Sequence, residues 1–256
     1  MTAPTALAAA EGRLKPAAEL AGSPGTAPGP HAATSRHSLE IDGDDRARGR
    51  WDTEPIVPRL YYMPRTRSSR VLWLLAELGA PCELTRLAPE ERKSAEHLAR
   101  HPLGRVPALE LDDGTVVFES AAICLQLADL HPDAGVIPPL GSAERALVYQ
   151  WVLFGMTELE APLYRWVREG AEGSTDSPEH GRFAQSAAAL ESALEGREWL
   201  LGERFTVADV ICASVLGSAH SRGLLADWPG LQAYVERGEA RPAFIEAAAI
   251  ANQPRS

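Results

Sequence analysis

The stretch HPLGRVPALELDDGTVVFESAAI, residues 101–123, decides the fold of this chain. Pro107 stands directly before the apolar run ALEL, which is typical of a strand, and the turn signal Asp112-Asp113-Gly114 separates that run from a second strand. Glu119 and Ser120 then stand where another apolar segment begins. The stretch predicts two strands joined by a hairpin, followed by a helix that starts beside an acid and a hydroxyl.

The residues before this stretch predict strands that alternate with helices. Residues 59–63 are a short β-prone run, and residues 64–69 form a polar loop. Apolar side chains then recur at i, i+3, i+4 and i+7, the spacing of one helix face: Val71, Leu74, Leu75 and Leu78. Residues 82–87 predict the next strand and residues 94–100 the next helix. Together with the hairpin and its following helix, the order is βαβ and then αββα.

A boundary follows this α/β pattern. Residues 132–141 contain three prolines and two glycines, the composition of a linker. We therefore expect an α/β domain over residues 56–131 and an all-helical domain over residues 142–250.

Two long segments and one capping signal define the helical half. Residues 142–168 predict a helix kinked at Pro162, and residues 182–195 predict a second helix. Thr206 and Asp209 have the spacing of a capping box, and the residues after them are apolar on nearly every side. This pattern predicts a buried helix that begins at Thr206.

The first 55 residues have a different composition. They are rich in Ala, Pro, Gly and charged residues and hold few large apolar side chains. Such a segment buries too little surface to offset the entropy of its chain, so we expect a disordered tail. An organelle transit peptide is the alternative, although Glu11 and Glu19 and the scarcity of arginine argue against it.

The charge and the cysteines exclude several classes of protein. A formal net charge of −10 argues against binding to nucleic acid, which requires a basic surface. The three cysteines are far apart and form no CxxC pair, and the seven histidines show no metal-ligand spacing, so we expect a reducing compartment and no metal. No apolar run approaches the roughly 20 residues that span a bilayer. We therefore expect a cytoplasmic protein with no membrane partner.

Four segments in a fixed order carry a resemblance to a known family. They are LYYMPRTRSSRVLWLLAELG, HPLGRVPALELDDG, FES and LLGERFTVADV, within residues 58–245. Together they resemble the glutathione S-transferases of the cytosolic, bacterial-like type. The resemblance implies a thioredoxin-like α/β N-terminal domain followed by an all-α C-terminal domain, with glutathione as co-substrate and a homodimer as the assembly.

The resemblance also assigns glutathione-binding residues. It implies a cis bond before Pro107, so that the backbone of Val106 pairs with the cysteinyl unit like an added strand. It implies that Glu119 and Ser120 hold the γ-glutamyl end and that Arg105 lies near the glycyl carboxylate. The alternatives are structural: Pro107 as a strand start, Ser120 as a helix cap and Arg105 as an exposed surface residue.

The loop of residues 64–69 is where the resemblance places thiol activation. Lowering the thiol pKa by two units takes about 2.7 kcal/mol, and a hydrogen bond to a charged group supplies about 1.5–3 kcal/mol. The candidate hydroxyls are Thr66, our first choice, then Ser68 and Ser69. The alternatives are a turn residue for Thr66 and a helix cap for Ser68 or Ser69. The loop holds no cysteine, and Tyr61 and Tyr62 lie within the strand, so a Ser/Thr-type site is expected.

The expected activity is conjugation of the glutathione thiolate to a small hydrophobic electrophile. We expect the electrophile to sit between the two domains, against Trp151 and Phe154. Two alternatives stay open: a non-catalytic glutathione-binding or regulatory protein of the same fold, and a glutathione-dependent disulfide reductase that works without an enzyme cysteine.

Overall fold

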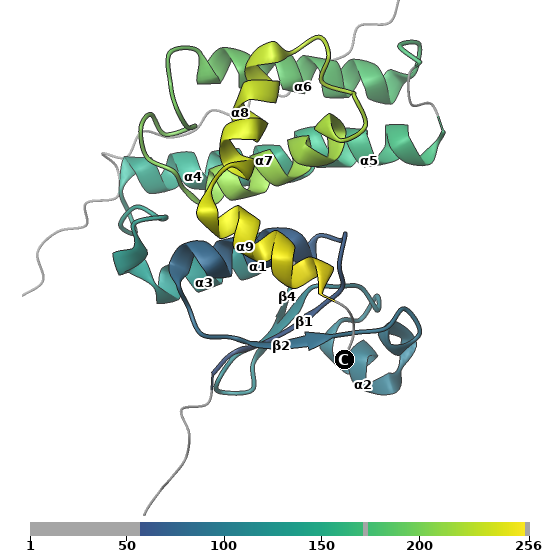
Figure 1. Cartoon of the computed structure of the whole chain (residues 1–256), viewed down its shortest axis with the longest axis vertical. Helices are drawn as coiled ribbons and strands as arrows, with labels where there is room; N and C mark the ends of the chain where they lie inside the picture. The colour runs from purple at the N-terminus through teal and green to yellow at the C-terminus, as the bar shows by residue number, and fades with distance from the viewer. Residues whose placement is uncertain (1–56, 171–173, 254–256) are drawn as a thin grey trace, which may run out of the picture. The chain divides into compact units, whose positions relative to one another are not determined.

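The computed structural model describes residues 57–170 and 174–253 (Figure 1). The expected tail, residues 1–55, and its transit-peptide alternative lie outside the described residues. Within the described ranges, no helix is both long and apolar enough to cross a membrane.

The first half contains a four-stranded sheet in the order β2-β1-β3-β4. β1 (Arg59–Tyr62) pairs in parallel with β2 (Glu83–Arg86) and antiparallel with β3 (Ala108–Glu110), which pairs antiparallel with β4 (Val116–Phe118). The parallel pair requires a crossover, which α1 (Ser68–Leu78) supplies. The predicted hairpin between β3 and β4 is confirmed.

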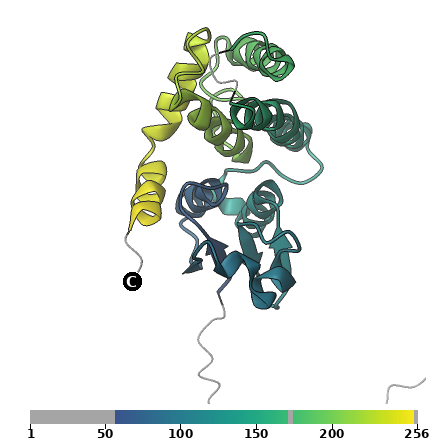
Figure 2. The ribbon, with the colours of Figure 1, turned by 90° about the vertical axis from the view of Figure 1, so that its right-hand side faces the viewer.

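Two helices separate this sheet from the helical half (Figures 1 and 2). α1 packs against α3 (Ser120–Leu130) and against α7 (Val207–His220) of the helical half. Because α1 has neighbours on several sides, Val71, Leu72, Trp73, Leu74 and Leu75 are all buried. The short helix α2 (Ala95–Arg100), capped by Ser94, lies on the side of the sheet away from the helical half.

The second half is helical. Its elements are α4 (Ala143–Phe154), the π-helical η4 (Gly155–Glu160), α5 (Ala161–Arg168), α6 (Pro178–Leu194), α7 (Val207–His220), α8 (Pro229–Glu239) and α9 (Pro242–Asn252). Two short 3-10 turns, η2 (Glu91–Lys93) and η3 (Pro132–Ala134), lie in the first half and the linker. The sheet followed by the helices is a thioredoxin-like α/β domain followed by an all-α domain, which confirms the predicted fold class.

α7 is the central helix of this half. It begins with the predicted capping box, in which the Thr206 backbone N–H donates to the Asp209 carboxylate at 2.8 Å. Ten of its residues are buried, as its all-round apolar sequence predicts.

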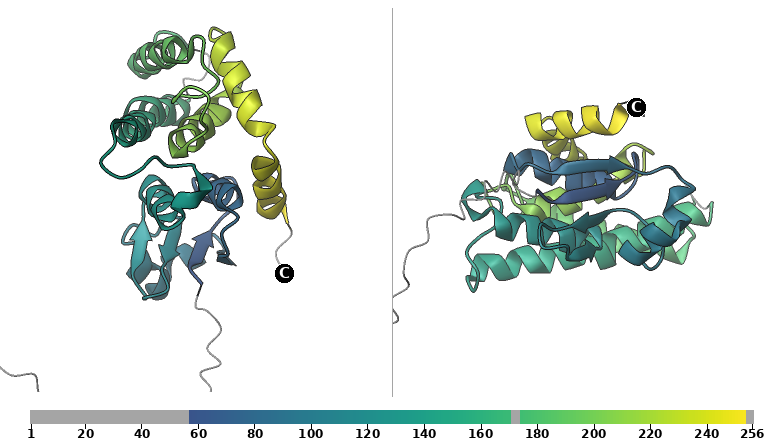
Figure 3. Two further views of the ribbon diagram at one scale, coloured as in Figure 1. Left: turned by 90° about the vertical axis from the view of Figure 1, so that its left-hand side faces the viewer. Right: turned by 90° about the horizontal axis from the view of Figure 1, so that it is seen from below.

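The chain returns to the first half at its end (Figure 3). α9 packs beside α1, where Phe244 meets the Trp73 ring edge-on at 5.0 Å between centroids. Arg241 also donates two hydrogen bonds to the Glu77 carboxylate, at 2.6 and 2.7 Å. One continuous apolar core therefore joins the two halves.

In the segment of residues 142–168, the structure places the helix irregularity elsewhere than the sequence predicted. The irregularity lies in the π-helical segment at Gly155–Glu160 and not at Pro162, which sits in the first turn of α5 where a missing N–H costs little. Gly155 faces α7 so closely that a Cβ atom there would lie 3.0 Å from Cys212 Sγ. Close packing of Gly155 against the Ile211 and Cys212 side chains of α7 accompanies this segment.

α6 also begins earlier than the predicted residue 182. Ser177 caps it by accepting a hydrogen bond from the Glu179 backbone N–H, and Pro178 occupies the first turn.

Candidate functional site

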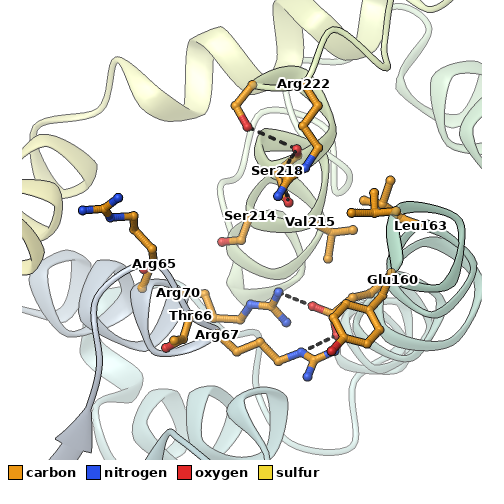
Figure 4. A pocket seen from close by; sticks show the side chains of 14 residues that line it. Arg65, Thr66, Arg67, Arg70, Glu160, Leu163, Ser214, Val215, Ser218 and Arg222 are labelled. Atoms are coloured by element: carbon orange, nitrogen blue, oxygen red, sulfur yellow. Dashed lines mark hydrogen bonds and ion pairs between the residues drawn. The ribbon is translucent and has the colours of Figure 1, made fainter. Parts of the chain in front are cut away.

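A cavity of about 590 Å³ lies between the loop before α1 and the helices α5 and α7 (Figure 4). The loop and α1 contribute Arg65, Thr66, Arg67, Ser69 and Arg70. η4 and α5 contribute Glu160, Leu163, Tyr164 and Val167, and α7 with the turn after it contributes Ser214, Val215, Ser218, Ser221 and Arg222. Residues of both domains therefore form one enclosure.

The three candidate hydroxyls differ in their access to this cavity. Thr66 and Ser69 line it, whereas Ser68 is fully buried and does not. Ser69 is exposed, and its hydroxyl makes no hydrogen bond within residues 57–170 and 174–253. The structure thus brings two of the three hydroxyls to a place where a ligand could meet them.

Thr66 is held by its own loop. Its Oγ1 donates to the Met63 carbonyl at 2.7 Å, lies 3.0 Å from Ser68 Oγ and accepts the Ser68 backbone N–H at 3.2 Å. A hydroxyl that already accepts a hydrogen bond is a stronger donor. An anion in the cavity would be a better acceptor for that proton than the neutral carbonyl of Met63.

Arginines surround the start of α1. Arg67 Nε and Arg70 Nη2 donate to the two oxygens of Glu160, at 2.8 and 2.6 Å. Arg65 is exposed, has a positive φ of 55° and forms no ion pair with any residue that the structure describes. Since the described lining holds three arginines and one glutamate near this loop, the potential at the loop favours an anion.

The Val106–Pro107 bond is cis, as the resemblance implies. Val106 is buried at 9% exposure, and its backbone N–H and C=O make no hydrogen bond to the described backbone. Arg105 is exposed, and its carbonyl oxygen lies 2.8 Å from Nε2 of the buried His97. Gly104 lies at φ 59°, and a Cβ there would meet the Arg92 carbonyl oxygen at 2.5 Å. His97 and Gly104 therefore fix the course of the chain into Val106.

Glu119 and Ser120 stand where α3 begins. Glu119 is exposed and has a φ of 73°, a conformation that non-glycine residues rarely adopt and that tends to mark functional positions. Ser120 is buried, and its Oγ accepts a hydrogen bond from Arg70 Nη1 at 3.4 Å. Arg70 also lines the cavity, so its side chain connects Ser120 to the cavity.

His101 lies close to Glu119. It is buried and stacks on Phe118, with 4.9 Å between ring centroids. Burial lowers the pKa of His101, although the Glu119 charge opposes the shift. A neutral His101 leaves the Glu119 carboxylate available to a ligand cation.

Trp151 and Phe154 are not part of the cavity lining. Both lie on α4, pack against the core and meet edge-on at 5.3 Å between centroids. The apolar side of the cavity comes from Leu163, Val167 and Val215 instead. Neither this apolar side nor Arg70, Glu160 and His97 was identified from the sequence, because isolated residues of these types carry no motif.

The cysteines and acidic residues show no further site. Within the described ranges, no group of three or more His, Cys, Asp and Glu side chains is placed to hold a metal ion. Burial raises the pKa of the Cys82 thiol to about 11, so this thiol is protonated near neutral pH. Cys124 and Cys212 are buried.

Comparisons with known proteins point to one family. Residues 66–130 match the family model of the glutathione S-transferase N-terminal domain, and residues 178–237 match that of the C-terminal domain. The chain is 30% identical over 202 residues to glutathione S-transferase GstA of Escherichia coli O157:H7, covering 74% of this chain and 96% of that protein.

Solved structures are similar over the same region. A glutathione transferase from Methylococcus capsulatus is 34% identical, with a TM-score of 0.67, covering 76% of this chain and 98% of that one. A sphingomonad glutathione S-transferase complexed with glutathione is 30% identical, with a TM-score of 0.67, covering 77% and 100%.

Proposed function

The chain belongs to the glutathione S-transferase family of enzymes, and we propose that it conjugates the glutathione thiolate to a small hydrophobic electrophile. The observation that carries the proposal is the cavity, in which a loop of hydroxyls and arginines faces the apolar side chains of α5 and α7. The hydroxyls and arginines can stabilise a thiolate, and the apolar side chains can bind a small organic electrophile.

Glutathione would bind along the first domain. The N–H and C=O of Val106 would pair with its cysteinyl unit, because both groups lack a backbone partner in the described residues. Glu119 would accept the γ-glutamyl ammonium, and Ser120, at the N-terminus of α3, would face the γ-glutamyl carboxylate. The exposed Arg105 would serve the glycyl carboxylate. The sulfur would then point towards the loop of residues 64–69.

Thr66 is the residue to which we assign thiolate stabilisation. On binding, its proton would turn from the Met63 carbonyl to the sulfur, and the thiol proton would leave to solvent. A charge-assisted hydrogen bond supplies about 1.5–3 kcal/mol and the N-terminus of a helix about 0.3–1 kcal/mol. Their sum matches the roughly 2.7 kcal/mol needed to lower the thiol pKa by two units. Ser69 is the second donor, and the buried Ser68 supports Thr66.

The reaction itself is a displacement. The thiolate forms a carbon–sulfur bond to the electrophilic carbon, and the leaving group departs with the electron pair of the bond that breaks. The enzyme keeps the glutathione thiol ionised at neutral pH and orients the two reactants.

Turnover of 1-chloro-2,4-dinitrobenzene by matched loop variants tests the proposal. We expect Thr66→Ala to lower kcat/KM by about 10- to 100-fold, the equivalent of the lost hydrogen bond. Thr66→Ser keeps the hydroxyl and should stay within a few-fold of wild type, while Ser69→Ala should have a smaller effect than Thr66→Ala. Equal turnover in all these variants would remove Thr66 from the mechanism.

Glutathione binding and a disulfide substrate separate the two alternatives. Retention on immobilised glutathione that Glu119→Ala abolishes, with no turnover of any electrophile, would identify a binding protein. Turnover of a disulfide substrate alone would identify a reductase.

A further inference from the structure

The wall of the cavity on α7 carries polar groups that an apolar electrophile does not need. Ser214 and Ser218 are one helical turn apart, so both lie on the face of α7 that borders the cavity. Ser221 and Arg222 follow in the turn after α7 and also line it. In Figure 4, Ser218 and Arg222 lie at one side of the cavity and Thr66 at the other.

The hydrogen bonds of this wall leave one hydroxyl proton for a ligand. Ser214 Oγ donates to the Val210 carbonyl, and Ser221 Oγ donates to the Ser218 carbonyl at 3.2 Å. Ser218 Oγ accepts from Arg222 Nη1 at 2.9 Å, and it donates to no group in the part of the chain that the structure describes. Because a charged donor polarises this hydroxyl, Ser218 is the strongest neutral donor on the wall.

The charge of the cavity lining favours an anionic ligand. Among the described residues of the lining, Arg65, Arg67 and Arg70 stand against one acid, Glu160, which Arg67 and Arg70 both contact. This excess of positive charge occurs in a chain whose formal net charge is −10. A cationic, partly enclosed site in an acidic protein concentrates anions and disfavours cations.

We propose that the electrophile carries an anionic group, of which a carboxylate is the simplest, and that this group accepts the Ser218 proton beside Arg222. The apolar part of the molecule contacts Leu163, Val167 and Val215, and its reactive carbon faces the Thr66 side. This inference rests on the proposed function, because it assigns the second substrate of the same cavity. It makes Ser218 and Arg222 the residues that determine specificity.

Glutathione also carries carboxylates, so the test must separate the two ligands. The probes are 3,5-dinitrobenzoate and 3,5-dinitrobenzamide, which have the same shape, differ in charge and lack a leaving group. Calorimetric titration of the full chain gives the Kd of each probe, with and without saturating S-methylglutathione. Because no turnover is involved, the result is independent of whether the enzyme conjugates any electrophile.

With S-methylglutathione bound, we expect the benzoate to bind about tenfold more tightly than the benzamide, as one charge-assisted contact predicts. Ser218→Ala and Arg222→Gln should each reduce this preference to less than about twofold. Ser221→Ala, whose hydroxyl proton already has a backbone acceptor, is the matched control and should keep the preference. All three side chains are exposed, so these variants should fold.

Three outcomes would overturn the inference. They are equal or weaker affinity for the benzoate, a preference that Ser218→Ala leaves intact, and a preference that disappears when S-methylglutathione saturates the site. The proposed function fails separately, if neither 4-chloro-3,5-dinitrobenzoate nor its amide reacts with glutathione faster in the presence of the enzyme.

Discussion

At the scale of single residues, Asp209 shows how one buried carboxylate organises the helical half. It is fully buried and accepts hydrogen bonds from the Leu200 N–H at 2.9 Å, the Thr206 N–H at 2.8 Å and the Tyr234 hydroxyl at 3.0 Å. Burial raises the pKa of Asp209, and these donors oppose the shift. The carboxylate thus joins the start of α7 to the preceding turn and to α8.

Replacing this carboxylate should be costly. We expect Asp209→Ala to lower the free energy of unfolding by about 3–5 kcal/mol, because four buried donors, including the Thr206 hydroxyl, lose their acceptor at once. Urea denaturation followed by circular dichroism measures the change. Asp227→Ala, at an exposed turn position, is the control and should stay within about 0.5 kcal/mol. A similar small change for Asp209→Ala would show that the donors find other acceptors.

The residues that the sequence could identify are those that belong to a local motif. The cis bond before Pro107 and the capping box of Thr206 and Asp209 are confirmed, and the glutathione-binding role of Glu119 and Ser120 stays a prediction. His97 and Ser218 could not be identified in this way. The role of each depends on a contact that a lone histidine or serine in a helix does not reveal.

At the scale of elements, the pairing of Arg70 with Glu160 joins α1 to η4. Arg70 is 4% exposed, and besides Glu160 it contacts Ser120 Oγ at 3.4 Å and Met156 Sδ at 3.1 Å. Its Nε is buried without a hydrogen-bond partner in the described residues. Because water hardly reaches the Arg70 guanidinium, its positive charge is compensated mainly by the Glu160 carboxylate.

Removing one charge of this pair should cost more stability than removing both charges. We expect Arg70→Met to destabilise the fold by about 3 kcal/mol, the lower end for a broken buried pair, because Arg67 still contacts Glu160. The double variant Arg70→Met with Glu160→Gln should be less destabilised than Arg70→Met alone. Chemical denaturation of the two variants and wild type gives both values. A double variant that is at least as unstable as the single one would contradict a role confined to charge compensation.

Element types were easier to predict than their irregularities. The alternation of strands and helices in the first half follows from apolar periodicity and turn residues, both of which are local. The π-helical turn at Gly155–Glu160 coincides with the close approach of α7, which lies about 60 residues later in the chain and leaves no local signal. Proline is a strong local signal, so the sequence placed the irregularity at Pro162.

At the scale of the whole molecule, exposed apolar side chains suggest an interface for the expected homodimer. Tyr149 and Leu153 lie one turn apart on α4 and are 36% and 63% exposed, and Phe118 and Leu130 are 40% and 50% exposed. We propose that α4 contributes such side chains to a dimer interface. Light scattering should give twice the chain mass of 27.5 kDa. Leu153→Glu should shift the population to the monomer because it buries a charge, and a monomeric wild type at micromolar concentration would contradict the proposal.

The cavity is the feature of the whole molecule that the sequence predicted least well. Its lining comes from three segments that are far apart in the chain, residues 65–70, 160–167 and 214–222. The loop hydroxyls belong to a local motif and were predicted, with Ser68 now placed outside the cavity. The charge of the opposite wall depends on how α5 and α7 face α1, which no local pattern encodes.

The ionisation of enzyme-bound glutathione tests whether Thr66 stabilises the thiolate. The thiolate absorbs in the ultraviolet, so a pH titration of the binary complex gives the pKa of the bound thiol. We predict a value about two units below the ordinary 8.5 or so for wild type and Thr66→Ser, and a return by at least about one unit towards 8.5 for Thr66→Ala. A bound thiol that titrates near 8.5 in wild type, or whose pKa does not respond to Thr66→Ala, would contradict the account.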